Sequence, residues 1–341
     1  MFKGYSKRFF SCVLLVFISN ANNAQKDSTI YERYGEKFVW YSDLGFSTAP
    51  IKLKYPFESG IERIKYKNNM SAIWGLGFSY KWFALRLGIT IPGTIRPPSQ
   101  YGRTTYYDIG FDFSVKRTFF DVDFHQYNGY AIKNAYRWND SLNGLKPHDI
   151  RSDIGAASFS INSWFFKNHH FKMQAFRGKT GAYKKDIQTF YLKATMNIHG
   201  VGSNSNESLI PIELQDSTQS KTRTVGITAF DIGVVPGMAY VKRWNAFQIG
   251  IMGGAGLVIQ SKFYSLDSLS RGYLGLAPRI DVKFIAGYNQ PRYFLMLVTD
   301  FDNKSIRFNN LVYRQTFYNI KLVGGIRLDR KKKQKKPKSN N

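Results

Sequence analysis

Two stretches of alternating residues around a two-residue break constrain this fold most. Apolar residues occupy every second position from Ala72 to Tyr80, and again from Phe83 to Ile91 after the break at Lys81-Trp82. Alternation with a period of two on both sides of a tight turn predicts a β-hairpin. Its apolar face must lie against lipid or against a second sheet. The predicted register pairs Phe78 with Leu85, Leu76 with Leu87 and Trp74 with Ile89.

Similar alternation recurs along the chain, and short connections alternate imperfectly with long ones, which is typical of transmembrane β-barrels. A barrel with both ends in the periplasm needs an even number of strands, so a further strand is expected within residues 49–66. The alternation slips one step between residues 178 and 223: either residues 170–198 hold one strand, or Leu209 to Leu214 adds one. The other strands are expected near residues 72–80, 83–91, 104–116, 119–127, 154–165, 170–178, 188–198, 224–240, 246–259, 274–288, 293–301 and 314–328.

The sequence therefore predicts an all-β fold, an antiparallel up-and-down transmembrane β-barrel, with 12 strands favoured and 14 possible. Short turns at the periplasmic end and longer extracellular loops follow from this topology. The short turns are expected near residues 81–82, 117–118, 166–169, 241–245 and 289–292, and the longer loops near residues 92–103, 128–153, 199–223, 260–273 and 302–313.

The N-terminus has the pattern of a secretory signal peptide. Basic residues precede the short apolar run from Phe9 to Ile18, and Ala24 ends a plausible cleavage site. The run is too short for a spanning helix. Cys12 is the only cysteine, so the mature chain would lack one, which excludes disulfides and cysteine-based zinc sites.

Charge and position suggest four segments. The net charge is +26, and the tail from Arg330 to Asn341 is dense in lysine. Such a tail is expected to be solvated and disordered, and in a secreted chain it does not indicate nucleic-acid binding. The predicted segments are a signal peptide at 1–24, an N-terminal periplasmic segment at 25–48, an outer-membrane barrel at 49–329 and the basic tail at 330–341.

Aromatic and basic residues gather at the predicted short turns. Such rings and cations suit a membrane–water interface, where the ring meets acyl chains and the cation meets phosphates. Because aromatic residues end strands in many sheets, a secreted soluble β-sandwich that binds a ligand stays open as an alternative. The predicted interfacial residues are Tyr80, Lys81, Trp82, Arg117, Phe119, Trp164, Lys167, Arg243, Trp244, Tyr288, Arg292 and Tyr293.

Four blocks in order resemble a known family: Tyr66 to Asn69, Trp74 to Leu85, Tyr101 to Phe113 and Phe119 to Tyr130. They are similar to domain-of-unknown-function family 4421, a family of predicted outer-membrane proteins of the Bacteroidota. The resemblance covers most of the mature chain. It implies a β-barrel in the cell outer membrane and implies no activity. The basic tail departs from barrels that end on an aromatic residue, which the barrel-assembly machinery reads.

The polar faces of the predicted strands carry both signs of charge. A packed salt-bridge network in a narrow lumen is favoured over a selective pore, which needs a dominant sign. The predicted registers set Asp112 opposite Asp123 and Asp281 opposite Asp300, and like charges across a ladder destabilise it. Each pair should recruit a cation or hold a proton. The predicted lumen network comprises Arg86, Asp108, Asp112, Asp123, His125, Arg279, Asp281, Lys283 and Asp300.

No motif predicts catalysis, a cofactor or a metal ion. His125 shares a face with Asp121 and Asp123, but no serine is tied to it by a motif. The expected protein is a non-enzymatic outer-membrane barrel with a structural, binding or transport role. Its expected partners are outer-membrane lipid, lipopolysaccharide and the barrel-assembly machinery; no specific protein partner is predicted. An outer-membrane enzyme that modifies lipid or lipopolysaccharide stays open as an alternative.

Overall fold

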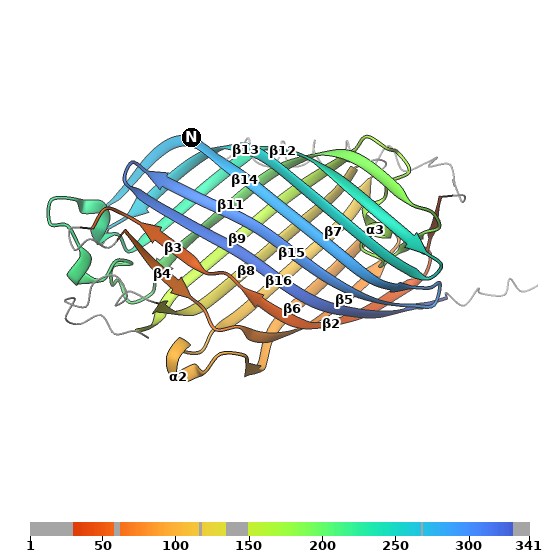
Figure 1. The fold of residues 1–341 in the computed structure, drawn as a ribbon, viewed down its shortest axis with the longest axis horizontal. Helices are drawn as coiled ribbons and strands as arrows, with labels where there is room; N and C mark the ends of the chain where they lie inside the picture. Colours follow the sequence, from red (N-terminus) through yellow and green to blue (C-terminus); the bar gives the residue numbers. More distant parts are fainter. Residues whose placement is uncertain (1–29, 58–61, 116–117, 134–148, 267–268, 330–341) are drawn as a thin grey trace, which may run out of the picture.

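The computed structural model describes residues 30–57, 62–115, 118–133, 149–266 and 269–329. Within them, 12 antiparallel strands form a closed ring (Figure 1). Ladder bonds between the last ring strand and the first close it. The predicted up-and-down barrel and its favoured strand number are therefore confirmed. In ring order the strands are β2 (Phe38–Thr48), β5 (Ser71–Tyr80), β6 (Phe83–Thr94), β7 (Thr105–Val115), β8 (Thr118–Lys133), β9 (Ile150–Phe166), β11 (Ile187–Ser203), β12 (Gly226–Trp244), β13 (Phe247–Ser265), β14 (Ser270–Asn289), β15 (Tyr293–Phe308) and β16 (Leu311–Leu328).

The remaining elements are short and are not among the 12 ring strands. Strands β1 and β10 pair with each other as a separate two-stranded sheet. Among the described residues, no helix is long and apolar enough to cross a membrane. These short elements are β1 (Tyr31–Arg33), β3 (Ile51–Lys54), β4 (Arg63–Lys67), α2 (Pro98–Tyr101), α3 (Met173–Phe176), β10 (Gly181–Tyr183), η2 (Ile212–Leu214) and η3 (Ser220–Arg223).

The hairpin of β5 and β6 has the predicted register. Phe78 pairs with Leu85, and the other two predicted pairs are present as well. Lys81 takes a positive φ of 54° at the turn between the strands. Leu76 and Leu87 are each 52% exposed on the outside of the ring. The apolar face of the hairpin is therefore the exterior face of the barrel.

Large apolar side chains are exposed at alternate positions around most of the ring. Leu257 and Ile259 on β13 face outward, and so do Leu274 and Leu276 on β14. Soluble monomers rarely expose a contiguous apolar surface of this extent, whereas a transmembrane barrel presents one to lipid. A sandwich would bury these side chains between two sheets, so the alternative of a soluble β-sandwich is wrong.

The ring begins earlier than the sequence predicts. Its first strand is β2 at Phe38–Thr48, whereas the pattern placed a periplasmic segment at 25–48 and the first strand within 49–66. The exterior face of β2 is interrupted by Ser42, which hides the apolar alternation. The Ser42 hydroxyl oxygen accepts a bond of 2.9 Å from the indole N–H of Trp74. A neighbouring strand thus satisfies a polar group that made this segment look unlike a membrane strand.

Two connections also differ from the pattern. Residues 167–186 form one long connection containing α3 and β10, so the predicted turn at 166–169 and strand at 170–178 are wrong. Between β9 and β12 the ring has a single strand, β11, where the pattern suggested two. This accounts for the slip in the alternation of short and long connections between residues 178 and 223. The loop predicted at 302–313 is instead the tight turn between β15 and β16, where Asn309 takes a φ of 44°.

The wall of the barrel is built differently at its two ends. We call the end with the Lys81 turn the inner end, and the end with the β11–β12 connection the outer end. Strand β8 pairs with β7 as far as Asn128 and then, nearer the outer end, with β4. Strands β3 and β4 therefore complete the outer wall above the shorter β6–β7 hairpin. The tip of that hairpin, with α2, projects from the side of the barrel (Figure 1).

Candidate functional site

The lumen contains three layers. A buried apolar cluster fills the outer part, a second buried apolar cluster fills the inner part, and charged side chains occupy the space between them. Each apolar cluster includes residues of a connection that enters the lumen. We call these connections the outer plug (residues 204–225) and the inner plug (residues 167–186).

The outer plug places Leu209, Ile210 and Leu214 in the apolar cluster of the outer end. Its backbone is tied to the wall. The carbonyl oxygen of Ser208 accepts bonds of 3.2 and 3.1 Å from the two terminal guanidinium nitrogens of Arg151 on β9. The hydroxyl of Tyr66 on β4 donates to the carbonyl of Leu209. Buried backbone groups need such partners, so the plug is part of the folded core.

The inner plug places Phe171, Met173 and Phe176 in the apolar cluster of the inner end. Wall side chains bind its backbone. The Gln248 amide on β13 donates to the carbonyls of Ala175 and Phe176, each at 3.0 Å. Arg327 on β16 and Asn289 on β14 also donate to plug carbonyls, at 2.8 Å to Lys179 and 3.1 Å to Gly181 respectively.

A cavity of about 200 Å³ lies between the two plugs. Its lining holds acidic and basic side chains in nearly equal number, from most strands of the ring and from the inner plug. Among the described residues, no group of three or more His, Cys, Asp or Glu is arranged to hold a metal ion. The charged lining residues are Asp43, Arg86, Asp108, Asp112, Asp121, Asp123, His125, Arg177, Lys179, Lys193, Asp281, Lys283, Asp300, Asp302, Lys304 and Lys321.

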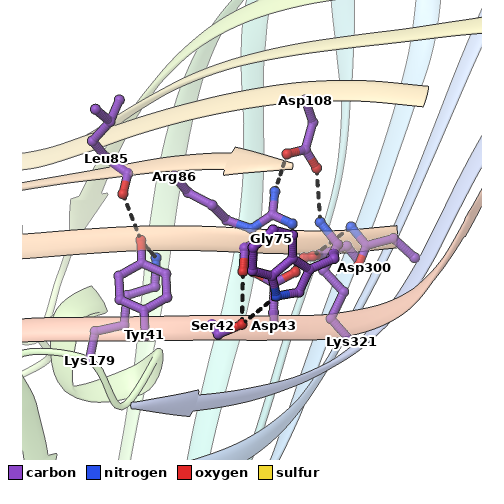
Figure 2. Close-up of polar contacts among 12 residues, drawn as sticks. Tyr41, Ser42, Asp43, Gly75, Leu85, Arg86, Asp108, Lys179, Asp300 and Lys321 are labelled. Atoms are coloured by element: carbon purple, nitrogen blue, oxygen red, sulfur yellow. Dashed lines mark hydrogen bonds and ion pairs between the residues drawn. The ribbon is translucent and has the colours of Figure 1, made fainter. Parts of the chain in front are cut away.

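One chain of ion pairs crosses four strands (Figure 2). Arg86 on β6 donates two bonds of 2.6 Å to Asp43 on β2 and a third bond to Asp108 on β7. Lys321 on β16 donates to the same Asp108 at 3.1 Å. The hydroxyl of Tyr106 donates a further bond of 2.5 Å to Asp108. Each charge thus has an opposite partner, which the low dielectric of a buried site requires.

A pair of like charges lies beside the inner plug. Asp112 pairs across the ladder with Asp121, two positions from the predicted Asp123, because the β7–β8 turn closes earlier than the pattern placed it. The guanidinium of Arg177 bonds Asp112 at 2.8 Å and Asp121 at 2.9 Å, as the predicted recruitment of a cation requires. Burial alone would lower the pKa of Arg177, but Asp112 and Asp121 outweigh it and raise that pKa.

The second predicted pair is displaced by two residues in the opposite direction. Asp281 lies opposite Asp302, and Lys283 lies opposite Asp300, so the predicted pairing of Asp281 with Asp300 is wrong. Lys283 bonds Asp300 at 2.7 Å, and Lys193 approaches Asp281 at 3.4 Å. Lys304 lies 3.6 Å from Asp302, so both acidic pairs face basic side chains of this chain.

A third cluster is fully buried toward the outer end. Asp231 on β12 lies 3.0 Å from Nε2 of His199 on β11 and accepts bonds from Arg279 on β14 and, at 2.8 Å, from the Gln260 amide on β13. The side chains of His199 and Asp231 have no exposed surface. This arrangement holds a charge in the core but offers no route for a substrate.

All nine predicted lumen charges point into the barrel. Eight line the cavity, and Arg279 lies in the buried cluster just described. His125 approaches the Tyr106 hydroxyl at 3.2 Å and so adjoins the Asp108 ion pairs. The pattern missed Asp43 because β2 was placed outside the barrel. It missed Arg177 and Lys179 because the inner plug was interpreted as a strand and its turn.

The predicted interfacial residues divide into two groups. Trp82, Trp244 and Tyr293 are exposed at the inner end, at 54%, 49% and 51%. Two ammonium groups lie over aromatic rings, Lys81 over Tyr80 and Lys167 over Phe190. Tyr288 stacks on Tyr293, and Arg292 is exposed. Arg243 donates a hydrogen bond to the carbonyl of Asn289.

The other group is a correction. Phe119 and Trp164 are 2% and 0% exposed and belong to the inner apolar cluster. They are wrong as interfacial residues because the alternation turns both side chains into the lumen; Phe165, next to Trp164, faces outward instead. Composition alone cannot tell which of two adjacent aromatic residues faces lipid. Arg117 lies outside the described residues.

The profile described as "Domain of unknown function (DUF4421)" matches residues 6–327. The chain belongs to this family. No functionally curated protein matches the DUF4421 chain significantly.

Several solved barrels are similar in outline. The outer membrane protease OmpT from Escherichia coli has 9% identity and a TM-score of 0.41, over 87% of this chain and 98% of that one. The translocator domain of the autotransporter NalP from Neisseria meningitidis has 6% identity and a TM-score of 0.40, over 93% and 94%. The toluene transporter TodX of P. putida has 8% identity and a TM-score of 0.30, over 86% and 91%. All three TM-scores lie below 0.5.

Proposed function

We propose that this DUF4421 protein is an integral outer-membrane barrel of the Bacteroidota envelope with a sealed lumen. In this proposal it has a structural or binding role that it exerts through its surfaces, and it is not an open diffusion pore. The observation that carries the proposal is the pair of plugs. Both are hydrogen-bonded to the wall and packed into apolar clusters, on either side of a charge layer that neutralises itself.

Two features support the location. The exterior of the ring is apolar at alternate positions, which suits lipid. The N-terminal pattern predicts export through a signal peptide, and a closed barrel of this kind avoids unpaired sheet edges in a membrane. Recovery of the protein with outer membranes, and its absence from the soluble periplasm, is the expected result of fractionation.

We also propose that the protein is not an enzyme. The alternative, an enzyme acting on lipid or lipopolysaccharide, needs a nucleophile or base that such a substrate can reach. His125 lines the cavity between the two plugs, and His199 is fully buried with Asp231. Replacement of His125 by Gln should leave the lipid and lipopolysaccharide profile of the envelope unchanged; an altered profile would favour the enzyme.

The test of the sealed lumen is conductance across a planar lipid bilayer. The wild-type barrel should show no stable conductance step. A variant in which residues 170–183 are replaced by a short Gly-Ser linker, together with a similar replacement of residues 206–222, should conduct if it folds. Resistance of the folded band to detergent on unheated gels serves as the folding control. A stable, reproducible conductance of the wild-type barrel would overturn the proposal.

A further inference from the structure

Four basic residues lie in one row across the outer wall. Arg314 on β16 pairs with Lys52 on β3, Lys52 pairs with Lys65 on β4, and Lys65 pairs with Lys133 on β8. Neighbouring strands lie about 4.8 Å apart, so four cations occupy a line of roughly 14 Å. We call these four residues the basic row.

The basic row is on the exterior face of the wall. The residues next to it along the strands, Ile51, Tyr66 and Ile132, are buried in the outer apolar cluster. Because side chains alternate between the two faces of a strand, the cations point away from the lumen. The charge layer inside the barrel therefore cannot neutralise them.

The row places like charges directly opposite one another, which destabilises a sheet. Burial and the neighbouring cations Arg63, Lys65 and Arg314 all lower the pKa of Lys52. Three more basic residues extend the same surface: Lys54 lies opposite Arg63 one step toward the outer end, and Lys67 lies one step toward the inner end. An extended anion with several negative groups is the natural complement of such a surface.

An apolar surface begins next to the row, on its side toward the inner end of the barrel. On the exterior face of β16, Arg314 is followed toward the inner end by the exposed residues Tyr318, Ile320 and Leu322. Arg314 lies four positions from Tyr318, which corresponds to about 13 Å along a strand. Leu44, which pairs with Leu322, continues this apolar surface onto β2. A ligand that combines phosphates with acyl chains would meet cations nearer the outer end of the barrel and apolar side chains nearer the inner end.

The projecting tip of the β6–β7 hairpin bounds the row at its β8 end (Figure 1). The ring of Tyr101 in α2 lies 4.9 Å from the ammonium of Lys133 and 5.1 Å from the guanidinium of Arg96. Arg96 in turn donates a bond of 2.8 Å to the carbonyl of Asn68, at the base of the tip. The tip is therefore fixed against the wall and presents a further cation beside the row.

We propose that the basic row binds the phosphate groups of a phosphorylated glycolipid of the outer leaflet, with the acyl chains of that lipid lying against the apolar surface below. The proposal rests on the outer-membrane location proposed above. The continuity of basic and apolar surface favours an amphiphile over a soluble polyanion, which would make no use of the apolar part.

The test uses diphosphoryl lipid A as the probe, added to the purified full-length barrel in a neutral detergent. The variant carries Lys52→Gln, Lys65→Gln and Arg314→Gln. A matched control carries Arg223→Gln, Lys262→Gln and Arg271→Gln, which removes the same charge from the same end of the barrel, on η3, β13 and β14 rather than on the strands of the row. Three lost charge contacts should weaken binding at least about tenfold, whereas the control should bind like the wild type.

Equal affinity of the row variant and the wild type would overturn the proposal, as would equal losses in the row variant and the control. Equal binding of a lipid A stripped of its phosphates would overturn it too. The unheated gel band shows whether each variant is folded. Bilayer conductance of the same wild-type preparation separates the two proposals: conductance with intact phosphate-dependent binding refutes only the sealed lumen, and a sealed barrel without that binding refutes only the glycolipid site.

Discussion

The lumen and the outer wall arrange their charges in opposite ways. Inside, Arg86 lies between two carboxylates, Asp43 and Asp108. Outside, Lys52 lies between two other cations, Arg314 and Lys65. The low dielectric of the interior makes an unpaired charge too costly to retain, whereas solvent and lipid headgroups tolerate one. The interior charges are therefore part of the folded core, whereas the exterior row sets cations beside cations on the outer surface.

The largest expected effect follows from breaking the interior arrangement. Arg86→Ala leaves Asp43 and Asp108 close together without their shared cation, and removal of one partner from a buried ion pair costs about 3–5 kcal/mol. Urea unfolding of the barrel in lipid vesicles measures the loss of unfolding free energy. Lys52→Ala on the exterior is the matched control and should change that free energy by less than about 1 kcal/mol. Similar losses in both variants would show that the two regions do not differ.

A second change tests where the exterior tolerates a cation. Leu322→Arg places a charge in the apolar surface of β16 and should cost roughly 2–4 kcal/mol if the site lies near the bilayer midplane. Val312→Arg, on the same strand and face but beside the basic row, should cost far less. The same unfolding assay compares them. Equal losses of unfolding free energy in the two variants would contradict the placement of Leu322 against acyl chains and of Val312 at the level of the headgroups.

The smallest expected effect concerns repulsion within the basic row. In a detergent without phosphate groups, Lys52→Gln should raise the unfolding free energy by about 0.2–1 kcal/mol, because it removes like charges from two directly opposed pairs. The gain should shrink at high salt, which screens exposed charges. Destabilisation by Lys52→Gln in low salt would mean that the row is already neutralised by the protein itself.

Much of the wall could be predicted from the sequence. A strand of a transmembrane barrel carries its inside–outside pattern in its own residues, so the β5–β6 pairing followed from Phe78 and Leu85 alone. Register across less regular turns was less certain. The β7–β8 ladder is shifted by two residues from the prediction. Asp112 pairs with Asp121, whereas the pattern paired it with Asp123.

The plugs could not be predicted, because their positions depend on contacts between distant parts of the chain. Phe171 and Phe176 look like residues of a strand, and only the space inside the finished ring shows that they fill it. The ion pairs of Arg177 depend on the same placement. The basic row likewise needs the pairing of β4 with β8, and Lys65 and Lys133 are far apart in the sequence.

The most direct test of the sealed lumen is chemical access to the cavity. Cys12 is the only cysteine and lies in the predicted signal peptide, so we expect the mature chain to provide a background without thiols. Ser160→Cys places a thiol in the cavity lining, and Ser99→Cys places one on exposed α2. In the folded, membrane-embedded barrel, a bulky membrane-impermeant maleimide should label position 99 rapidly and position 160 only after unfolding. Labelling of both positions at similar rates in the folded barrel would contradict a lumen closed at both ends.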